Sequence, residues 1–432
     1  MGDGPSARGL LLGRALAPSK APMGFAGRTE DAAPAGLIED RSDGHLLVVS
    51  PTSGGKGRNV IIPNLLTYEG PVVVVDPKGE ALAVTGRRRR ELGHRVIGLA
   101  PFAAQPGGSF NVFDILDPES PEFESDCVML SRMISGGQTS LSDRFWDQTA
   151  EAILAGAIAF IATERPPEQR NLCYLRTFFC DPDLSYAIAL ALDGPLSGKT
   201  GLACDEFRNF LGHEGEKVRT SVRSTVTQHL AIFAGPQIAA AVCTSSFELN
   251  DITLSAAISL YIVIPPHKLE AFGSLLRLWI GTLMVLVSRR AQTPDLPTLF
   301  VLDELAQLGP FPLLRPAVTL MRSYGLRCLL VLQDLAQLRT LFPTDHATIS
   351  NNSSTLLTFG HSAYAMSAEM AAMLGDVGAD ALFDMDRSSL AMRRQGRRTE
   401  IAVKLDYLTD PLFAGQFDVN PLAPARSPAL TR

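Results

Sequence analysis

The stretch LLVVSPTSGGKG, residues 46–57, decides the fold. Its first four residues are apolar, as in a short buried strand, and a glycine-bearing turn then leads to Lys56, where a helical pattern begins. Backbone N–H groups in such a turn and at the helix N-terminus point at a bound phosphate, and the lysine neutralises its charge. The stretch therefore predicts a phosphate-binding loop whose members are Thr52, Ser53, Gly54, Gly55, Lys56, Gly57 and Arg58.

This loop departs from the strict pattern G-x-x-x-x-G-K-[ST] at two positions. Ser50 replaces the first glycine, and Gly57 replaces the hydroxyl residue that would bind Mg²⁺. If only the match to this pattern is considered, the alternative to a phosphate-binding loop is a structural turn with an exposed lysine. A second stretch, GPLSGKT at 194–200, has one intervening residue too few and follows a helical segment rather than a buried strand. We therefore do not expect Lys199 to bind nucleotide.

Further short apolar runs lie on both sides of this loop and alternate with helical patterns. Strand–helix alternation at this spacing is typical of an α/β fold with a mostly parallel sheet. The runs that we expect to be strands are 46–49, 72–75, 96–99, 258–264, 298–303, 327–333 and 355–359.

Strand patterns are missing from about residue 117 to residue 241, where helical periodicity replaces them. The stretch is much longer than a usual crossover connection, which favours an inserted all-helical domain over a helical layer of one domain. The sheet domain is then built from two parts. The expected division is an N-terminal, partly irregular segment (1–44), the nucleotide-binding domain (45–116 and 242–417), the insertion (117–241) and a disordered tail (418–432).

Composition sets limits on the class of protein. The chain has 432 residues, of which 46% are apolar and 19% charged, as in ordinary globular proteins. Its formal net charge of -6 means that any contact with DNA must come from a local basic patch or from a pore made by assembly. The longest apolar runs, 153–162 and 278–287, are far shorter than the roughly 20 residues that span a bilayer. We therefore predict no transmembrane segment in this chain.

A pair of carboxylates follows the predicted strand TLFVL at 298–302. At the end of a strand beside the phosphate loop, Asp303 would hold Mg²⁺ through water and Glu304 would polarise the attacking water. Gln333 ends the next strand and would sense the γ-phosphate at the same edge of the sheet. The alternatives are a solvated strand end or helix cap for the two carboxylates and a loop-bonded glutamine for Gln333.

Charged residues also follow the strand at 72–75. Asp76, Lys78 and Glu80 are expected to support the residues that touch the nucleotide, although a capped helix start explains them nearly as well. Two basic clusters could line a pore and bind phosphate without sequence preference, or could form solvated helix faces. Their members are Arg87–Arg90 and Arg387, Arg393, Arg394, Arg397 and Arg398.

Taken together, these blocks resemble the type IV secretion coupling proteins, the conjugative DNA-transfer ATPases. The resemblance covers roughly 44–116 and 140–378, and GKG is a common form of the loop in that family. The blocks that carry it, in order, are PTSGGKG (51–57), IIPNLL (61–66), VVVVDPKGE (72–80), SFNVFDIL (109–116), RFWDQTAEAILAG (144–156), VLDELAQLG (301–309) and LLVLQDLAQL (329–338).

The resemblance implies a RecA-like P-loop domain that binds ATP and Mg²⁺ and assembles with copies of itself into a ring, usually a hexamer. It also implies ATP-driven transfer of DNA, a relaxase–DNA complex or effector proteins to the components of a secretion channel, with the helical domain as a recruiting surface. In such rings an arginine of the neighbouring copy completes each site. Arg322 matches that position best and Arg327 second, with a surface arginine as the alternative.

Two departures from the family stand out. Its members usually carry N-terminal membrane helices, and none is visible in this sequence. We expect either a soluble relative, cytoplasmic or recruited to the inner face of the inner membrane, or a chain that was cut before Met1. The part after Asp384 is also short, which leaves the ring contact in that region open. An ATP-binding docking adaptor with little turnover is the competing function.

Overall fold

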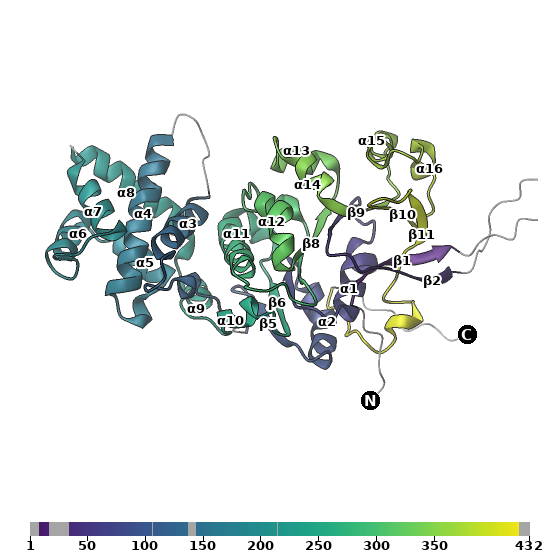
Figure 1. The fold of residues 1–432 in the computed structure, drawn as a ribbon, viewed down its shortest axis with the longest axis horizontal. Coiled ribbons are helices and arrows are strands. Elements are labelled where there is room, and N and C mark those ends of the chain that lie inside the picture. The colour runs from purple at the N-terminus through teal and green to yellow at the C-terminus, as the bar shows by residue number, and fades with distance from the viewer. Residues whose placement is uncertain (1–7, 17–33, 106, 137–143, 214, 423–432) are drawn as a thin grey trace, which may run out of the picture.

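The computed structural model describes residues 8–16, 34–105, 107–136, 144–213 and 215–422. Figure 1 shows two regions side by side, a helical region containing α3 to α8 and a region built around a long sheet. The sheet has 11 strands in the order β2-β1-β11-β10-β9-β3-β8-β7-β4-β6-β5. The structure therefore confirms an α/β fold that is interrupted by a helical domain.

Seven neighbouring strands of this sheet run parallel, and all seven were predicted. Each is short and rich in apolar residues, and all except the edge strand β5 are largely buried on both faces, as parallel strands covered by helices are. They are β3 (His45–Val49), β4 (Val72–Val75), β5 (Arg95–Leu99), β6 (Ile258–Ile262), β7 (Thr298–Leu302), β8 (Leu326–Leu332) and β9 (Ser353–Phe359).

Alternate residues of each strand face opposite sides of the sheet, and both sides are covered. Leu46 and Val48 of β3 join a core with α1 (Ile62–Thr67) and α2 (Glu80–Glu91). Leu47 and Val49 point the other way, into a second core with α11 (Pro266–Ser288) and α12 (Leu314–Leu320). The remaining helices of the sheet domain are α13 (Leu335–Leu341), α14 (His346–Asn351), α15 (Tyr364–Leu374) and α16 (Ala379–Phe383).

The chain leaves the sheet after β5 and returns at β6, and the described residues between them form helices only. The second core runs without interruption from the sheet into this helical domain, through residues such as Phe110, Phe160 and Trp279. The boundaries at 117 and 241 remain a prediction. The helices are α3 (Phe123–Ser135), α4 (Arg144–Glu164), α5 (Leu172–Phe179), α6 (Leu184–Asp193), α7 (Leu202–Gly212), α8 (Glu216–Leu230), α9 (Pro236–Val242) and α10 (Leu249–Thr253).

Four strands extend the sheet beyond β9, and the sequence patterns did not reveal them. The strands β10 (Ser389–Arg394), β11 (Glu400–Val403), β1 (Leu10–Leu16) and β2 (Pro34–Asp40) follow one another in antiparallel order. The segment 1–44, predicted as partly irregular, thus supplies two strands. Antiparallel strands at one end of a sheet need no continuous apolar run, which explains why they escaped notice.

The tail beyond residue 417 was predicted to be disordered, and for its first part this is wrong. The backbone N–H of Asp418 donates to the carbonyl of Val84, and the Asn420 amide donates to Glu80. Residues 423–432 lie outside the described part of the chain.

The basic cluster at 87–90 is not one solvated helix face. The side chains of Arg88 and Arg89, which belong to α2, are buried. Arg89 donates to backbone carbonyls of Tyr68 and Gly70. In the second cluster, Arg393 and Arg394 lie on a strand rather than a helix. Buried guanidinium groups that bind carbonyls hold the structure together and cannot line a pore.

One described helix, α11, is long and apolar enough to cross a membrane by length and composition. Most of its apolar window, 72%, is buried inside the protein, where it covers one face of the sheet. This is the position of a core helix in a folded domain.

Candidate nucleotide site

The phosphate loop follows β3 and turns sharply before the helix. The backbone of Ser53 (φ 66°) and Gly55 (φ 90°) is left-handed. A Cβ atom on Gly55 would lie 2.1 Å from Oδ1 of Asn59, so this position requires glycine. A Cβ atom on Gly57, by contrast, would meet nothing within 4 Å. The loop is thus tightly folded at its tip and open at the position where related loops carry a hydroxyl.

Lys56 and the carboxylates after β7 converge at the carboxyl edge of the sheet. Lys56 Nζ lies 2.7 Å from Glu304 Oε1 and 3.9 Å from Asp303 Oδ1. Their strands, β3 and β7, are separated only by β8 and run parallel, so their carboxyl ends share one edge. The sequence prediction depended on this convergence.

The backbone of Glu304 is strained. Its φ of 54° is left-handed, and Glu304 is one of three such non-glycine residues in the described chain. Its N–H donates to Oδ1 of Asp303 at 3.0 Å, which fixes the two carboxylates relative to each other. Such a conformation costs on the order of 1–3 kcal/mol and persists where surrounding contacts hold it, most often at functional sites.

Gln333 connects the two sides of the site. Its amide nitrogen donates to Glu304 Oε2 at 2.9 Å, and its amide oxygen accepts from the hydroxyl of Thr52 at 3.1 Å. The end of β8 therefore joins the phosphate loop to the carboxylate. A change in either neighbour alters the hydrogen bonds of the glutamine, which is the property a γ-phosphate sensor needs.

The two carboxylates titrate differently. Burial raises the pKa of Asp303 to about 6, because the nearby charge of Lys56 offsets desolvation only in part. Burial also pushes the pKa of Glu304 upward, but hydrogen bonds from Lys56 and Gln333 outweigh it, and the pKa falls below its ordinary value. At neutral pH Glu304 is therefore ionised, as a carboxylate that accepts a proton must be.

The residues after β4 divide between two tasks. Asp76 is buried, and its carboxylate accepts from the backbone N–H of Leu82, so it caps α2. Its pKa is raised to about 6, chiefly by burial. Glu80 accepts from Asn420 of the C-terminal segment. Lys78 is exposed, and its charge helps to lower the pKa of Glu304. The capped helix start, weighed as the alternative, describes Asp76 best.

A segment after β11 also contacts the loop, although no sequence pattern singled it out. Lys404 Nζ lies 3.4 Å from the carbonyl of Gly54 and 4.0 Å from the centre of the Phe359 ring. Burial lowers the pKa of this lysine to about 8. Asp406 forms an ion pair with Arg58 of the loop. Only the antiparallel extension of the sheet brings this segment to the loop, which is why it was missed.

The arginines proposed to act across copies have different positions. Arg322 lies on a short turn before β8, half-exposed and paired with Asp43 at 2.9 Å. Both residues precede their strands, at the edge opposite the nucleotide site, so Arg322 lies away from the nucleotide site of its own copy. Arg327 is 1% exposed and paired with Asp40, which excludes it from that role. Lys199 pairs with Glu164 in the helical domain.

The residues at this edge fit a magnesium-bound nucleotide. The ammonium of Lys56 already binds an anionic oxygen, and the phosphate oxygens of a nucleotide offer the same partner. Asp303 supplies the carboxylate oxygen that Mg²⁺ prefers. A side chain at Gly54 or Gly55 would collide with neighbouring atoms, so these positions present only backbone to a ligand, as a phosphate-binding loop requires.

The chain also matches a known protein family. The family model for type IV secretory system conjugative DNA transfer matches residues 20–381. The chain belongs to this family. Among curated relatives, it is 29% identical to VirD4 of Rhizobium radiobacter over 301 residues, which is 68% of this chain and 42% of that protein. It is 25% identical to TraG of Escherichia coli over 311 residues, 68% of this chain and 49% of that protein.

The chain spans about half the length of these curated relatives, or less. Among solved structures, the plasmid coupling protein TrwB in complex with an ATP analogue covers 95% of this chain and 98% of its own, with a TM-score of 0.66 and 17% identity. VirB4 of Thermoanaerobacter pseudethanolicus gives a TM-score of 0.55 at 14% identity over 94% of this chain. These likenesses establish the RecA-like fold of a type IV coupling protein.

Proposed function

We propose that this protein binds ATP with Mg²⁺ and hydrolyses it to move DNA, or a protein–DNA complex, toward a type IV secretion channel. The observation that carries the proposal is the convergence of Lys56, Asp303, Glu304 and Gln333 on one edge of the sheet. The TrwB structures with ADP and Mg²⁺ and with an ATP analogue support it, because they share this fold.

Each residue has a role that its position suggests. Lys56 and the backbone of the loop bind the phosphates, and Asp303 holds the water shell of Mg²⁺, which neutralises phosphate charge. Glu304, ionised and fixed by its strained backbone, orients the attacking water and accepts its proton. Gln333 contacts the γ-phosphate and passes its presence to Thr52 and Glu304 through the hydrogen bonds described above.

The proposed role of Arg322 requires a second copy of the protein. Its position on the opposite edge suits a ring in which one copy supplies the arginine and its neighbour supplies Lys56 and Glu304. An arginine placed against the γ-phosphate stabilises the charge of the transition state. We propose a homo-oligomeric ring with DNA in its pore, with secretion-channel components and effector proteins as further partners.

The decisive experiment measures ATP turnover with and without single- and double-stranded DNA while particle mass is followed by light scattering. The proposal expects Mg²⁺-dependent turnover that DNA stimulates, together with a mass of several copies. Binding of ATP without turnover in every condition would instead support a docking adaptor. A transfer assay with Lys56→Ala and Glu304→Gln separates the two further, since an adaptor would keep working with both substitutions.

A further inference from the structure

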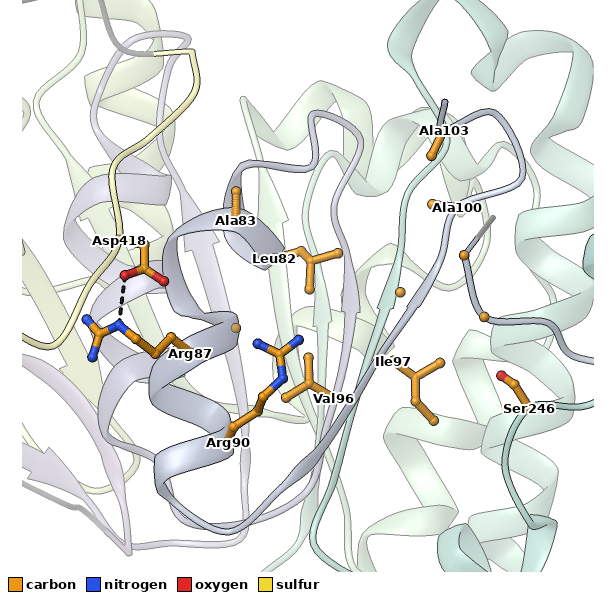
Figure 2. A pocket seen from close by; sticks show the side chains of 14 residues that line it. Leu82, Ala83, Arg87, Arg90, Val96, Ile97, Ala100, Ala103, Ser246 and Asp418 are labelled. Carbon is orange, nitrogen blue, oxygen red and sulfur yellow. Dashed lines mark hydrogen bonds and ion pairs between the residues drawn. The ribbon is translucent and has the colours of Figure 1, made fainter. Parts of the chain in front are cut away.

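A groove at the β5 edge of the sheet shares no residue with the nucleotide site. Figure 2 shows it between α2 and the edge strand β5, with Arg87 and Arg90 on one wall and Ser246 on the other. Its volume is about 630 Å³. Leu82, Val96 and Ile97 line it with apolar surface, while glycines 98, 107 and 108 leave part of it as bare backbone.

The strand β5 is the last strand of the sheet, so one of its edges has no neighbouring strand. The N–H of Arg95 and the carbonyl of Leu99 bond to residues beside β6, so the intervening Ile97 also faces β6 in a regular parallel ladder. Val96 and Gly98 therefore face outward. The carbonyl of Gly98 accepts from Gly108, but the described residues supply no hydrogen bond to the N–H and carbonyl of Val96 or to the N–H of Gly98.

The groove lining carries two arginines, Arg87 and Arg90, and one carboxylate, Asp418, so its net charge is positive. Arg90 is exposed on the groove wall, and no carboxylate of the described chain pairs with it. Arg87 already shows what such an arginine binds, because it holds the carboxylate of Asp418 at 2.8 Å. The segment around Asp418 approaches α2 along its backbone, through the hydrogen bond to Val84. This rim of the groove therefore already accepts an acidic side chain from another segment of the chain.

From these observations we propose that the β5 groove, defined by Leu82, Arg87, Arg90, Val96 and Gly98, docks an extended acidic peptide of a partner protein as an additional strand. The free backbone groups of Val96 and Gly98 pair with the peptide backbone. One face of the peptide then meets Leu82 and Val96 with apolar side chains and Arg90 with carboxylates. A nucleic acid suits the groove less well, because its lining contains no aromatic ring for stacking.

The test uses fluorescently labelled peptides of roughly eight residues, a usual strand length, in which valine alternates with glutamate. A matching peptide with lysine in place of glutamate tests the charge. Two further peptides carry N-methyl groups on alternate amides, one in each register. Fluorescence anisotropy with the full chain is expected to show binding of the acidic peptide only, and loss of binding with one methylated register but not the other.

Two variants test whether the peptide binds at the β5 groove. Arg90→Glu changes an exposed side chain and should weaken binding at least about tenfold, because attraction becomes repulsion. Val96→Pro removes an outward N–H that an edge strand does not need for its own ladder, and should weaken binding similarly. Arg208→Glu, an equal charge change on α7 of the helical domain, is the matched control and should leave affinity unchanged.

The outcomes are distinct from those of the ATPase proposal, since all three variants should retain wild-type ATP turnover. Equal affinity for the acidic and lysine peptides, or equal tolerance of both methylated registers, would overturn strand addition. Absence of binding at low salt and millimolar peptide would do the same. If single-stranded DNA binds instead, and Arg90→Glu abolishes its binding while Val96→Pro does not, the groove is a phosphate-binding surface and the peptide proposal is wrong.

Discussion

Lys56 and Glu304 are joined by an ion pair of 2.7 Å although 248 positions separate them in the chain. The lysine is the helix-opening residue of the phosphate loop, and the glutamate is held in left-handed backbone directly after β7. Gln333 binds the other oxygen of the same carboxylate. A phosphate that draws Lys56 away would leave Glu304 tied to Gln333 and free to orient water on its other side.

Substitutions at the two ends of this ion pair should separate binding from chemistry. Glu304→Gln is expected to lower ATP turnover by roughly 10²–10⁴-fold, since a general base is lost, while nucleotide binding is kept. Lys56→Ala should abolish binding itself. Steady-state turnover and titration with a fluorescent nucleotide measure both effects. Wild-type turnover by Glu304→Gln would remove Glu304 from its proposed role.

Two glycines of the loop should respond oppositely to the same substitution. Gly55→Ala should destabilise the fold by about 1–3 kcal/mol, because φ is 90° and the new Cβ atom would collide with Asn59. Gly57→Ala meets no atom within 4 Å and should be neutral or stabilising by up to about 1 kcal/mol. Urea unfolding of the two variants makes the comparison. Similar losses in both would show that the loop is not folded as described.

The buried ring of His45 should make the protein sensitive to acid. Its Nε2 lies 3.0 Å from the carbonyl of Val318 and its Nδ1 accepts from the N–H of Cys328, so the ring is neutral. Burial lowers its pKa to about 4 from 6.5. The unfolded chain therefore gains a proton at higher pH than the folded one. This contribution to stability is complete above pH 6.5 and is lost as pH falls toward 4, by up to about 3 kcal/mol.

Unfolding of wild type and His45→Gln across this pH range provides the test. Glutamine offers a donor and an acceptor but does not titrate. The difference in free energy of unfolding between wild type and His45→Gln should therefore narrow as the pH falls. His94, whose pKa is also lowered to about 4, is present in both proteins and cancels. Parallel curves would mean that His45 is not buried in its neutral form.

Neighbouring arginines of α2 should differ sharply in their contribution to stability. Arg89 is fully buried and donates to the carbonyl of Gly70 at 2.7 Å and to the hydroxyl of Ser259 at 2.9 Å. Arg89→Met should cost at least about 3 kcal/mol, because several buried acceptors lose their donor. Arg89→Lys should not restore the lost stability, since lysine lacks the planar, forked guanidinium group of arginine. The exposed Arg90 serves as the control, and Arg90→Met should change stability by less than about 0.5 kcal/mol.

The proposed role of Arg322 predicts complementation between two inactive variants. Arg322→Ala and Lys56→Ala should each lose ATP turnover when assayed alone. Mixing them creates some interfaces in which an intact loop faces an intact arginine, and turnover should partly return. Its dependence on protein concentration measures the assembly. If the mixture stays as inactive as its components, the arginine does not act across copies.

The parts of the fold that were predictable from sequence are those in which one local pattern is sufficient. Most of the seven parallel strands are continuous apolar runs such as VVVV at 72–75, because both of their faces are buried. The phosphate loop and the Asp303–Glu304 pair are adjacent to such runs. Their meeting followed from the rule that parallel strands share a carboxyl edge.

The missed parts depend on contacts between distant segments. Lys404 reaches the phosphate loop only because β10 and β11 fold back beside β9, and nothing in the sequence of β11 indicates a site. Arg89 and Arg90 are neighbouring residues of the same type, so the sequence does not distinguish them. Arg89 is buried and Arg90 is exposed, because consecutive helical residues point in directions about 100° apart.

The strand order of the sheet also governs how the protein is made. The first parallel strands to leave the ribosome, β3 and β4, are not neighbours in the finished sheet, because β8 and β7 lie between them. Neither of those two strands is synthesised until the helical domain and α11 are complete. The nascent chain therefore carries the apolar strand β3 without either of its neighbours in the sheet until β8 is made, and β4 without a neighbour until β6 is made. We expect chaperones to bind it during that interval, and interrupted translation to yield fragments that aggregate.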